Sequence, residues 1–498
     1  MKRIVFLIMM AAGLIALAAC EEITNQEEQG VVSMTSFGFY MQDNPDLYSD
    51  VVIENITSNA ITVRFPMVTP ESAISSLVPR FEVTEGATVL NGNTQVISGE
   101  TAVDFSSPVD LVVSLGSSNA MYTITVLINQ PLKWEMLAQS EIAMADGPVM
   151  AISQTDGIPY LFGSIDAEES DFEYPNLLAL SGSTLESVAG NLIQARARYY
   201  ALEISPDGIP YVSFDDYSLE THMQSVMKVE DGTASYVGNA GSLYQTGGNE
   251  LTAVALFPFS DNDVWCAQYN NTRNVSIERR CLNFAHYSNS SWALGQSLQG
   301  RNPSSYAYNN IGRIVDGIGY LMVHNQNQNT LSMYKYEDNV WSSIFEELQI
   351  MKADGSGAAQ INLRDMDFDV ASNGDIYILV ACDYLTGDYN PAVIRYDIET
   401  QTQTIISGVL TNIDIDESRS ISMSLDMDDI PYIVFVNPED NDKTYITYMD
   451  ANRQWSDPQA VSTSSTDNPA IRFAEDGTGY IAYLDTTTNK FVLYTNIE

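Results

Sequence analysis

Acidic side chains alternate along one short segment of the chain. Asp365, Asp367 and Asp369 are separated from each other by single residues. Because side chains of a β-strand point alternately to its two faces, this spacing places the three carboxylates on one face. Carboxylate oxygens are ligands that Ca²⁺ prefers, so one hypothesis is a calcium site near these residues. The alternative is that they bond to neighbouring backbone groups or face solvent. No other cofactor is expected.

Residues that mark common catalytic sites are sparse. The only histidines are His222, His286 and His324, too far apart in sequence for the close spacing typical of a zinc site. There is no Gly-x-Ser-x-Gly nucleophile motif and no phosphate-binding loop. We therefore assign no catalytic residue and favour a binding protein over an enzyme. Carboxylates contributed by distant segments, as in glycosidases, would leave no local motif, so the enzyme class stays open.

Two cysteines flank a predicted turn. Cys266 and Cys281 are equidistant from residues 273–274, which would place them opposite each other on consecutive strands. A disulfide is one hypothesis, because an exported chain can be oxidised. Two unpaired, buried thiols are the other. Cys382 ends an apolar run and is expected in a hydrophobic core.

The N-terminus has the features of an export signal. Lys2 and Arg3 precede a short apolar run, and Leu17-Ala18-Ala19-Cys20 follows it. This ending resembles the lipobox of bacterial lipoproteins. The resemblance implies that residues 1–19 are removed and that Cys20 is lipidated and anchors the chain to the outer membrane, with an acidic tether over residues 20–30. An ordinary secretory signal is the alternative. The acids after Cys20 resemble the surface-export signals of Bacteroidetes lipoproteins.

The charge of the chain narrows its partners. The sequence holds 22 basic and 65 acidic residues, a formal net charge of −43. A body this acidic repels nucleic acid and anionic membrane surfaces, so no nucleic acid is expected as a partner. Neutral glycans, cationic ligands and calcium remain compatible with this charge. Solubility at a crowded cell surface explains the acidic charge without any charge-specific partner, and we favour it.

One short pattern, a tight turn followed by an aromatic residue, recurs along residues 130–498. Its aromatic positions are spaced by 48 to 57 residues and are Tyr160, Tyr211, Trp265, Tyr320, Tyr377, Tyr432 and Tyr480. Asp-Gly and Asn-Gly before them tolerate positive φ and favour hairpins. Four strands in about 50 residues are typical of one propeller blade, and both faces of a blade are covered by its neighbours. The repeats are similar to degenerate propeller repeats of bacterial secreted proteins.

The repeats predict a seven-bladed β-propeller closed by a strand from its own N-terminal end. The seventh copy stops before a fourth strand, whereas residues 131–137, which contain Trp134, resemble a fourth strand without a preceding blade. We therefore expect this segment to complete the last blade and remove open sheet edges. An open array or an eight-bladed ring is the alternative.

Loops between the second and third strands of the blades are the expected ligand site. Tyrosine rings with asparagine and aspartate side chains can stack on sugars and bond to their hydroxyl groups, although the same residues are ordinary in polar loops. The predicted ligand-binding residues are Asp215, Asp216, Tyr217, Tyr269, Asn270, His324, Asn325, Asp383, Tyr384 and Tyr389.

Residues 31–129 lack the repeat and are predicted to form a β-sandwich. Short alternating strands are broken by turn residues such as Asn91-Gly92-Asn93. The segment resembles the immunoglobulin-like modules behind the lipid anchor of Bacteroidetes surface lipoproteins. That resemblance implies a spacer between membrane and propeller, with carbohydrate binding as the other interpretation.

Together these features predict an all-β, lipid-anchored cell-surface binding protein whose ligand is a glycan or another extracellular macromolecule. Two other functions remain open: a polysaccharide-cleaving propeller, either a glycoside hydrolase or a lyase, and a structural subunit of an envelope complex. One fold hosts many functions, so the repeat alone does not decide between them.

Overall fold

The computed structural model describes residues 32–166, 173–219, 223–243, 251–270, 281–296, 307–326, 328–385, 389–410 and 421–497. Within these residues the regular secondary structure is almost entirely β-strand, with two short 3-10 helices. It divides into two compact units, one ending at Asn129 and the other beginning at Gln130. None of the helices in the described ranges has the length and apolar character needed to cross a membrane.

The N-terminal unit is a sandwich of two sheets. The strands are β1 (Met34–Phe39), β2 (Val51–Glu54), β3 (Ala60–Phe65), β4 (Pro79–Val83), β5 (Thr88–Asn91), β6 (Thr94–Val96), β7 (Val109–Leu115) and β8 (Ser118–Ile128), with the 3-10 helix η1 (Glu71–Ser76). Their orders are β2-β1-β4 and β3-β8-β7-β5-β6. Both sheets contribute to one core, in which Phe37 and Phe39 of the first meet Phe65 and Val113 of the second. The predicted sandwich is confirmed, and β3 joins β8 in parallel.

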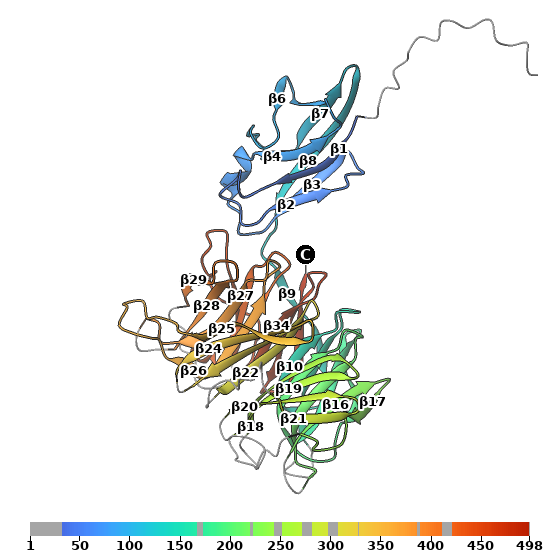
Figure 1. Ribbon diagram of the computed structural model, residues 1–498, viewed down its shortest axis with the longest axis vertical. Helices are drawn as coiled ribbons and strands as arrows, with labels where there is room; N and C mark the ends of the chain where they lie inside the picture. The colour runs from blue at the N-terminus through green and yellow to red at the C-terminus, as the bar shows by residue number, and fades with distance from the viewer. Residues whose placement is uncertain are drawn as a thin grey trace, which may run out of the picture. The chain divides into compact units, whose positions relative to one another are not determined.

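The C-terminal unit is built of four-stranded antiparallel blades (Figure 1). Blade 1 is β10 (Met144–Ile152), β11 (Pro159–Asp166), β12 (Glu173–Ser181) and β13 (Thr184–Asn191); blade 2 is β14 (Ala197–Ile204), β15 (Pro210–Asp216), β16 (Met223–Glu230) and β17 (Thr233–Tyr236). Blade 3 is β18 (Leu251–Ser260), β19 (Asp263–Asn270), β20 (Cys281–Ser288) and β21 (Ser291–Gln296); blade 4 is β22 (Ala307–Val315), β23 (Ile318–Asn325), β24 (Thr330–Glu337) and β25 (Val340–Leu348).

The remaining blades follow the same order. Blade 5 is β26 (Ile361–Val370), β27 (Ile376–Cys382), β28 (Asn390–Asp397) and β29 (Thr402–Val409); blade 6 is β30 (Ile421–Leu425), β31 (Pro431–Asn437), β32 (Lys443–Tyr448) and β33 (Gln459–Ala460), with the 3-10 helix η2 (Pro438–Asp440). Blade 7 is β34 (Thr466–Phe473), β35 (Gly479–Asp485), β36 (Lys490–Ile497) and β9 (Lys133–Ser140).

The first strands of the blades form a closed ring. Each contacts the first strand of the next blade, from β10 through β14, β18, β22, β26 and β30 to β34, and β34 contacts β10 again. The second strand of each blade is covered on both faces by the two neighbouring blades, which explains why β27 is buried along its whole length. The tight turns behave as their chemistry predicts, since Gly208 and Gly374 have φ of +81° and +87°.

The expected closing strand is confirmed. Strand β9 pairs antiparallel with β36, where Trp134 lies opposite Asn496 and Glu135 opposite Thr495. Two residues of β9, Gln139 and Ser140, also pair in parallel with Thr184 and Leu185 of β13. Blades 1 and 7 therefore share one eight-stranded sheet, and the strand from the N-terminal end of this unit holds both ends of the ring together.

Candidate functional site

A cavity of about 880 Å³ follows the axis of the ring. Every first strand contributes to its lining, from residues 146–152 of β10 to residues 468–473 of β34. This follows from the fold, because the innermost strand of each blade faces the axis. A volume of this size is typical of sites for small molecules or for single units of a larger ligand.

The lining is strongly acidic. Among the described residues that line the cavity, the charged ones are Asp146, Asp156, Glu203, Asp316, Asp367, Asp369, Asp426, Asp429, Glu475, Asp476, Arg313 and Arg472. Ten carboxylates against two guanidinium groups give a negative field, which low-dielectric walls strengthen. Asp156, Asp316, Asp429 and Asp476 belong to the tight turns between first and second strands, so the repeated turn sequence itself makes one mouth of the cavity acidic.

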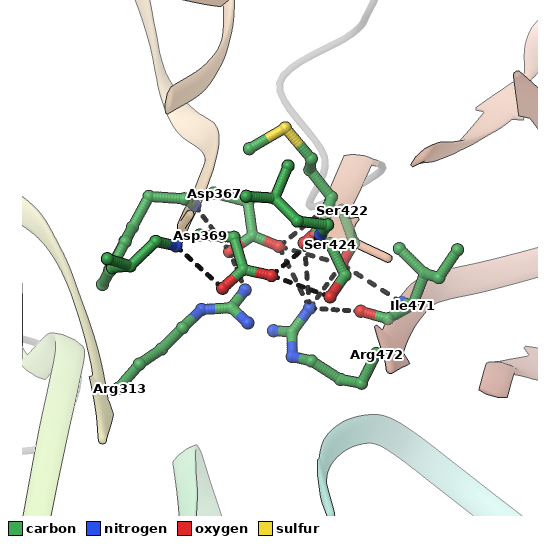
Figure 2. A network of polar contacts seen from close by, with 11 residues as sticks. Arg313, Asp367, Asp369, Ser422, Ser424, Ile471 and Arg472 are labelled. Carbon is green, nitrogen blue, oxygen red and sulfur yellow. Dashed lines mark hydrogen bonds and ion pairs between the residues drawn. The ribbon is translucent and has the colours of Figure 1, made fainter. Parts of the chain in front are cut away.

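Both arginines of the cavity lie against one aspartate (Figure 2). The Asp367 carboxylate accepts a hydrogen bond from Arg313 Nη2, and its Oδ2 lies 3.3 Å from Arg472 Nη1. Ser422 Oγ and Met423 N also donate to Asp367 Oδ2, over 2.9 and 3.0 Å. Four first strands, β22, β26, β30 and β34, thus meet at one side chain that is 4% exposed.

Asp369 repeats the same pattern two residues along the strand. Its Oδ2 accepts from Ser424 Oγ at 2.8 Å and from Leu425 N at 2.9 Å. The period of two in β26 therefore matches the period of two in β30, and each aspartate bonds to one serine and to the backbone amide after it. The close-up in Figure 2 shows both carboxylates between the two guanidinium groups and the serines.

The carboxyl groups of the cavity differ in their pKa values because their surroundings differ. Burial would raise the pKa of Asp367, but the charges of Arg313 and Arg472 outweigh it and lower the pKa to about 2. Burial dominates at Glu203 and raises its pKa to about 7, although hydrogen bonds from the amides of Ile204 and Ile314 oppose the shift. Burial also raises the pKa of Asp426 to about 7. The cavity therefore gains negative charge between mildly acidic and neutral pH.

The calcium hypothesis assumed that the carboxylates of Asp365, Asp367 and Asp369 are available to bind a metal ion. The oxygens of Asp367 and Asp369 accept hydrogen bonds from backbone amides, which the alternative named, and also from arginine and serine side chains, which it did not. The Asp365 side chain lies outside the described residues. Within those residues, no three His, Cys, Asp or Glu side chains are grouped as a metal site requires. In this arrangement Asp367 and Asp369 act as acceptors that join strands.

The predicted ligand-binding residues lie at the ends of second strands or just beyond them. Asp215 and Asp216 end β15, His324 and Asn325 end β23, and Asp383 and Tyr384 follow β27. Tyr389 precedes β28, and Tyr217 follows β15, where Arg196 lies over its ring. Tyr269 and Asn270 end β19, but their side chains lie outside the described residues. None of these ten residues is part of the described lining of the axial cavity.

Several of these side chains bond to residues of a neighbouring strand or of another loop. Asp216 is buried and accepts from Ser225 Oγ at 2.9 Å, and Asn325 donates to Ser332 Oγ at 3.1 Å. Asp383 accepts from Lys352 Nζ at 2.7 Å. His324 is 1% exposed, and burial lowers its pKa to about 4, so its ring is neutral at physiological pH. The polar loop residues that the sequence suggested for sugar binding therefore also stabilise the loop conformations.

Of the two hypotheses for Cys266 and Cys281, the structure does not support the disulfide, because Cys266 is a free thiol. In the hairpin of β19 and β20, Cys266 lies opposite Ala285 and Cys281 lies opposite Asn270, so the strand register separates the two cysteines by four positions. Cys266 is a free, buried thiol whose sulfur accepts a hydrogen bond from Gln224 Nε2. Cys382 is also free and buried, as expected for a core residue.

Sequence reasoning missed the two arginines that define the cavity. Arg313 and Arg472 are far from Asp367 in sequence, and only closure of the ring brings them together. One signal was present, because few of the 22 basic residues stand within apolar first-strand segments such as residues 311–315. A basic residue there needs a buried acidic partner.

The comparisons with known proteins concern both units. A family model described as "SGBP, N-terminal" matches residues 46–126, within the sandwich. No curated protein matches the chain in sequence.

Solved structures similar to the chain include lectins and an enzyme. A lectin from Burkholderia pseudomallei is 8% identical, with 73% of this chain and 99% of the lectin covered and a TM-score of 0.43. A polysaccharide lyase is 12% identical, with 70% and 89% covered and a TM-score of 0.42. A DUF4623 family protein from Bacteroides eggerthii is 12% identical, with 94% and 99% covered and a TM-score of 0.34.

Proposed function

We propose that the protein binds a glycan at the bacterial cell surface. The match of residues 46–126 to the SGBP N-terminal model carries this proposal, because that model describes a domain of Bacteroidetes glycan-binding surface proteins. The axial cavity of the second unit supplies a concave, polar site of suitable size. The sandwich is then the part nearest the membrane, and the propeller is the part that binds.

The lipobox-like segment supports anchoring at Cys20. A lipoprotein anchor carries several acyl chains, which makes membrane attachment stable. The Cys20→Ala variant should be released from the outer-membrane fraction into a soluble fraction. Protease added to intact cells should degrade the anchored protein if it faces outward. Retention of the variant in the membrane would contradict the lipid anchor.

Glycan binding is tested with the chain from residue 21 onward, purified without lipid. It should be retarded in native gels that contain a polysaccharide it recognises, or retained on a glycan array. Bovine serum albumin in the same gel controls for nonspecific retardation. A chain that migrates like albumin through every polysaccharide tested would overturn the proposal.

One observation favours a second function, cleavage of a polysaccharide. Glu203 lines the cavity, and its pKa of about 7 would let it act as a general acid near neutral pH. Incubation with polysaccharides followed by a reducing-end assay tests this function. Activity that is lost in Glu203→Gln, with binding retained, would establish it; no release of reducing ends from any polysaccharide that is bound would dismiss it.

A further inference from the structure

Asn310 is a buried carboxamide in the cavity lining without a hydrogen-bond partner. It lies on β22 and is 3% exposed, and neither its Nδ2 nor its Oδ1 bonds to another group in the described part of the chain. Arg313 Nε, three residues further along the same strand, is also buried and unbonded. Burying an amide without partners costs stability, and native proteins rarely do so without a reason.

The position of Asn310 separates it from the charged network. The Asn310 side chain points to the side of β22 on which a Cβ added at Gly312 would clash with Phe257 and Ala255 of blade 3, because alternate strand residues share a side. Arg313 points to the opposite side, where it reaches Asp367 of blade 5. The amide of Asn310 is therefore not required to balance the buried charges.

The chemistry of the lining limits what the amide can bind. A carboxamide offers two donors and an acceptor with two lone pairs, which matches neighbouring hydroxyl groups that both donate and accept. The two cationic side chains already share Asp367, and ten carboxylates line the cavity. A carboxylate or sulfate group on a ligand would meet repulsion there, whereas an uncharged sugar would not.

We infer that the axial cavity binds an uncharged, hydroxyl-rich sugar unit through the amide of Asn310, and that it rejects uronate and sulfated sugars. This inference rests on the proposed function and narrows it to a site and a ligand class. It moves recognition from the loops between second and third strands, where the sequence placed it, to the first strands around the axis.

The test compares Asn310→Leu with the unchanged chain, both purified from residue 21 onward. The probes are four neutral polysaccharides, amylopectin, dextran, galactomannan and xylan, and three acidic ones, polygalacturonate, alginate and chondroitin sulfate. The unchanged chain should bind at least one neutral probe and no acidic probe. Asn310→Leu should bind that probe about tenfold more weakly or worse, because it loses buried hydrogen bonds to the ligand.

The thermal midpoint of Asn310→Leu separates a ligand role from a structural one. Leucine has a similar volume and leaves no unpaired polar atom, so the midpoint should stay the same or rise while binding falls. The matched control is Gln268→Leu, because Gln268 is an equally buried, unbonded carboxamide that does not line the cavity. Its affinity should be unchanged. If Asn310→Leu does not fold, Asn310→Ala removes the same amide without adding a polar atom and serves for the binding comparison.

The outcomes distinguish this inference from the proposed function. Equal affinity of Asn310→Leu and the unchanged chain for a neutral probe would overturn the Asn310 site and leave glycan binding established. Retention of an acidic probe would overturn the ligand class alone. Retention of none of the seven probes would count against both.

Discussion

Arg472 in the last blade of the ring lies 3.3 Å from Asp367 in blade 5, measured between Nη1 and Oδ2. The same carboxylate bonds to Arg313 of blade 4 and to Ser422 of blade 6. Residues separated by more than a hundred positions are thus held by one side chain at the centre of the unit. Arg313 is buried and Arg472 is partly buried beside it, so the two guanidinium groups repel, and Asp367 offsets that repulsion.

Asp367→Asn should destabilise the propeller strongly. The substitution keeps the shape but leaves the buried guanidinium group of Arg313 and the partly buried one of Arg472 with less negative charge beside them, and breaking a buried pair in this way costs about 3–5 kcal/mol. Urea unfolding followed by tryptophan fluorescence measures the loss. The control is Glu337→Gln, which removes an exposed pair with Lys335 and should cost well under about 1 kcal/mol. Equal effects of the two substitutions would show that Asp369 and Glu203 suffice as counter-charges.

Acid should weaken the fold through the same carboxylate. The pKa of Asp367 is lowered to about 2, against an ordinary value of 3.8. Its contribution to the free energy of unfolding is therefore complete above about pH 4 and is lost as the pH falls toward 2. Thermal midpoints recorded from pH 5 to pH 2 should fall more steeply for the unchanged chain than for Asp367→Asn. Parallel curves would contradict the assignment.

Glu203 should make the stability of the fold change with pH in the opposite direction. Its pKa is about 7 in the folded chain and 4.5 ordinarily, so the folded state holds a proton that the unfolded state has lost between these values. Stability contributed by this group is complete below pH 4.5 and decreases as the pH rises through 7. Glu203→Gln should flatten the fall in thermal midpoint between pH 5 and pH 8. Asp426, whose pKa is also about 7, should keep part of the slope in that variant.

The fold followed from the sequence because its signals are local. Each copy of the repeat contains a tight turn, an aromatic residue at the start of a strand and an apolar second strand. These three features lie within a few residues of each other. The role of Trp134 was predictable for the same reason. Its segment looks like a fourth strand that precedes the first blade, and the last blade lacks a fourth strand of its own.

The site followed only in part, because its contacts join distant blades. Asp367 and Asp369 were identified as a set, but their partners Arg313 and Arg472 become neighbours only when the ring closes. The hypothesis of a disulfide between Cys266 and Cys281 failed for a related reason. Equal distance from a turn does not fix strand register, and here the hairpin pairs Cys266 with Ala285 instead of Cys281. The unbonded amide of Asn310 has no sequence signal at all.

Trp134→Ala should weaken closure of the ring. The indole packs edge-on against Tyr432 and Phe473, with ring centroids 6.5 and 6.1 Å away. Removing a partly buried indole from such a cluster should lower the free energy of unfolding by about 2–3 kcal/mol. Met136 lies on the same strand and is 59% exposed, so Met136→Ala is the matched control and should change stability by less than about 0.5 kcal/mol. Comparable urea midpoints for the two variants would argue against a role of Trp134 in holding the closing strand β9.

The free thiols should be chemically silent until the propeller unfolds. Burial raises the pKa of Cys266 and of Cys382 to about 12, and the thiolate is the reactive form. Iodoacetamide at pH 8 should therefore leave both residues unmodified in the folded chain and alkylate both in 8 M urea without a reductant. Peptide mass spectrometry reads each site separately. If Cys266 resists alkylation in urea until a reductant is added, it is held in a disulfide, and the register described for β19 and β20 is wrong.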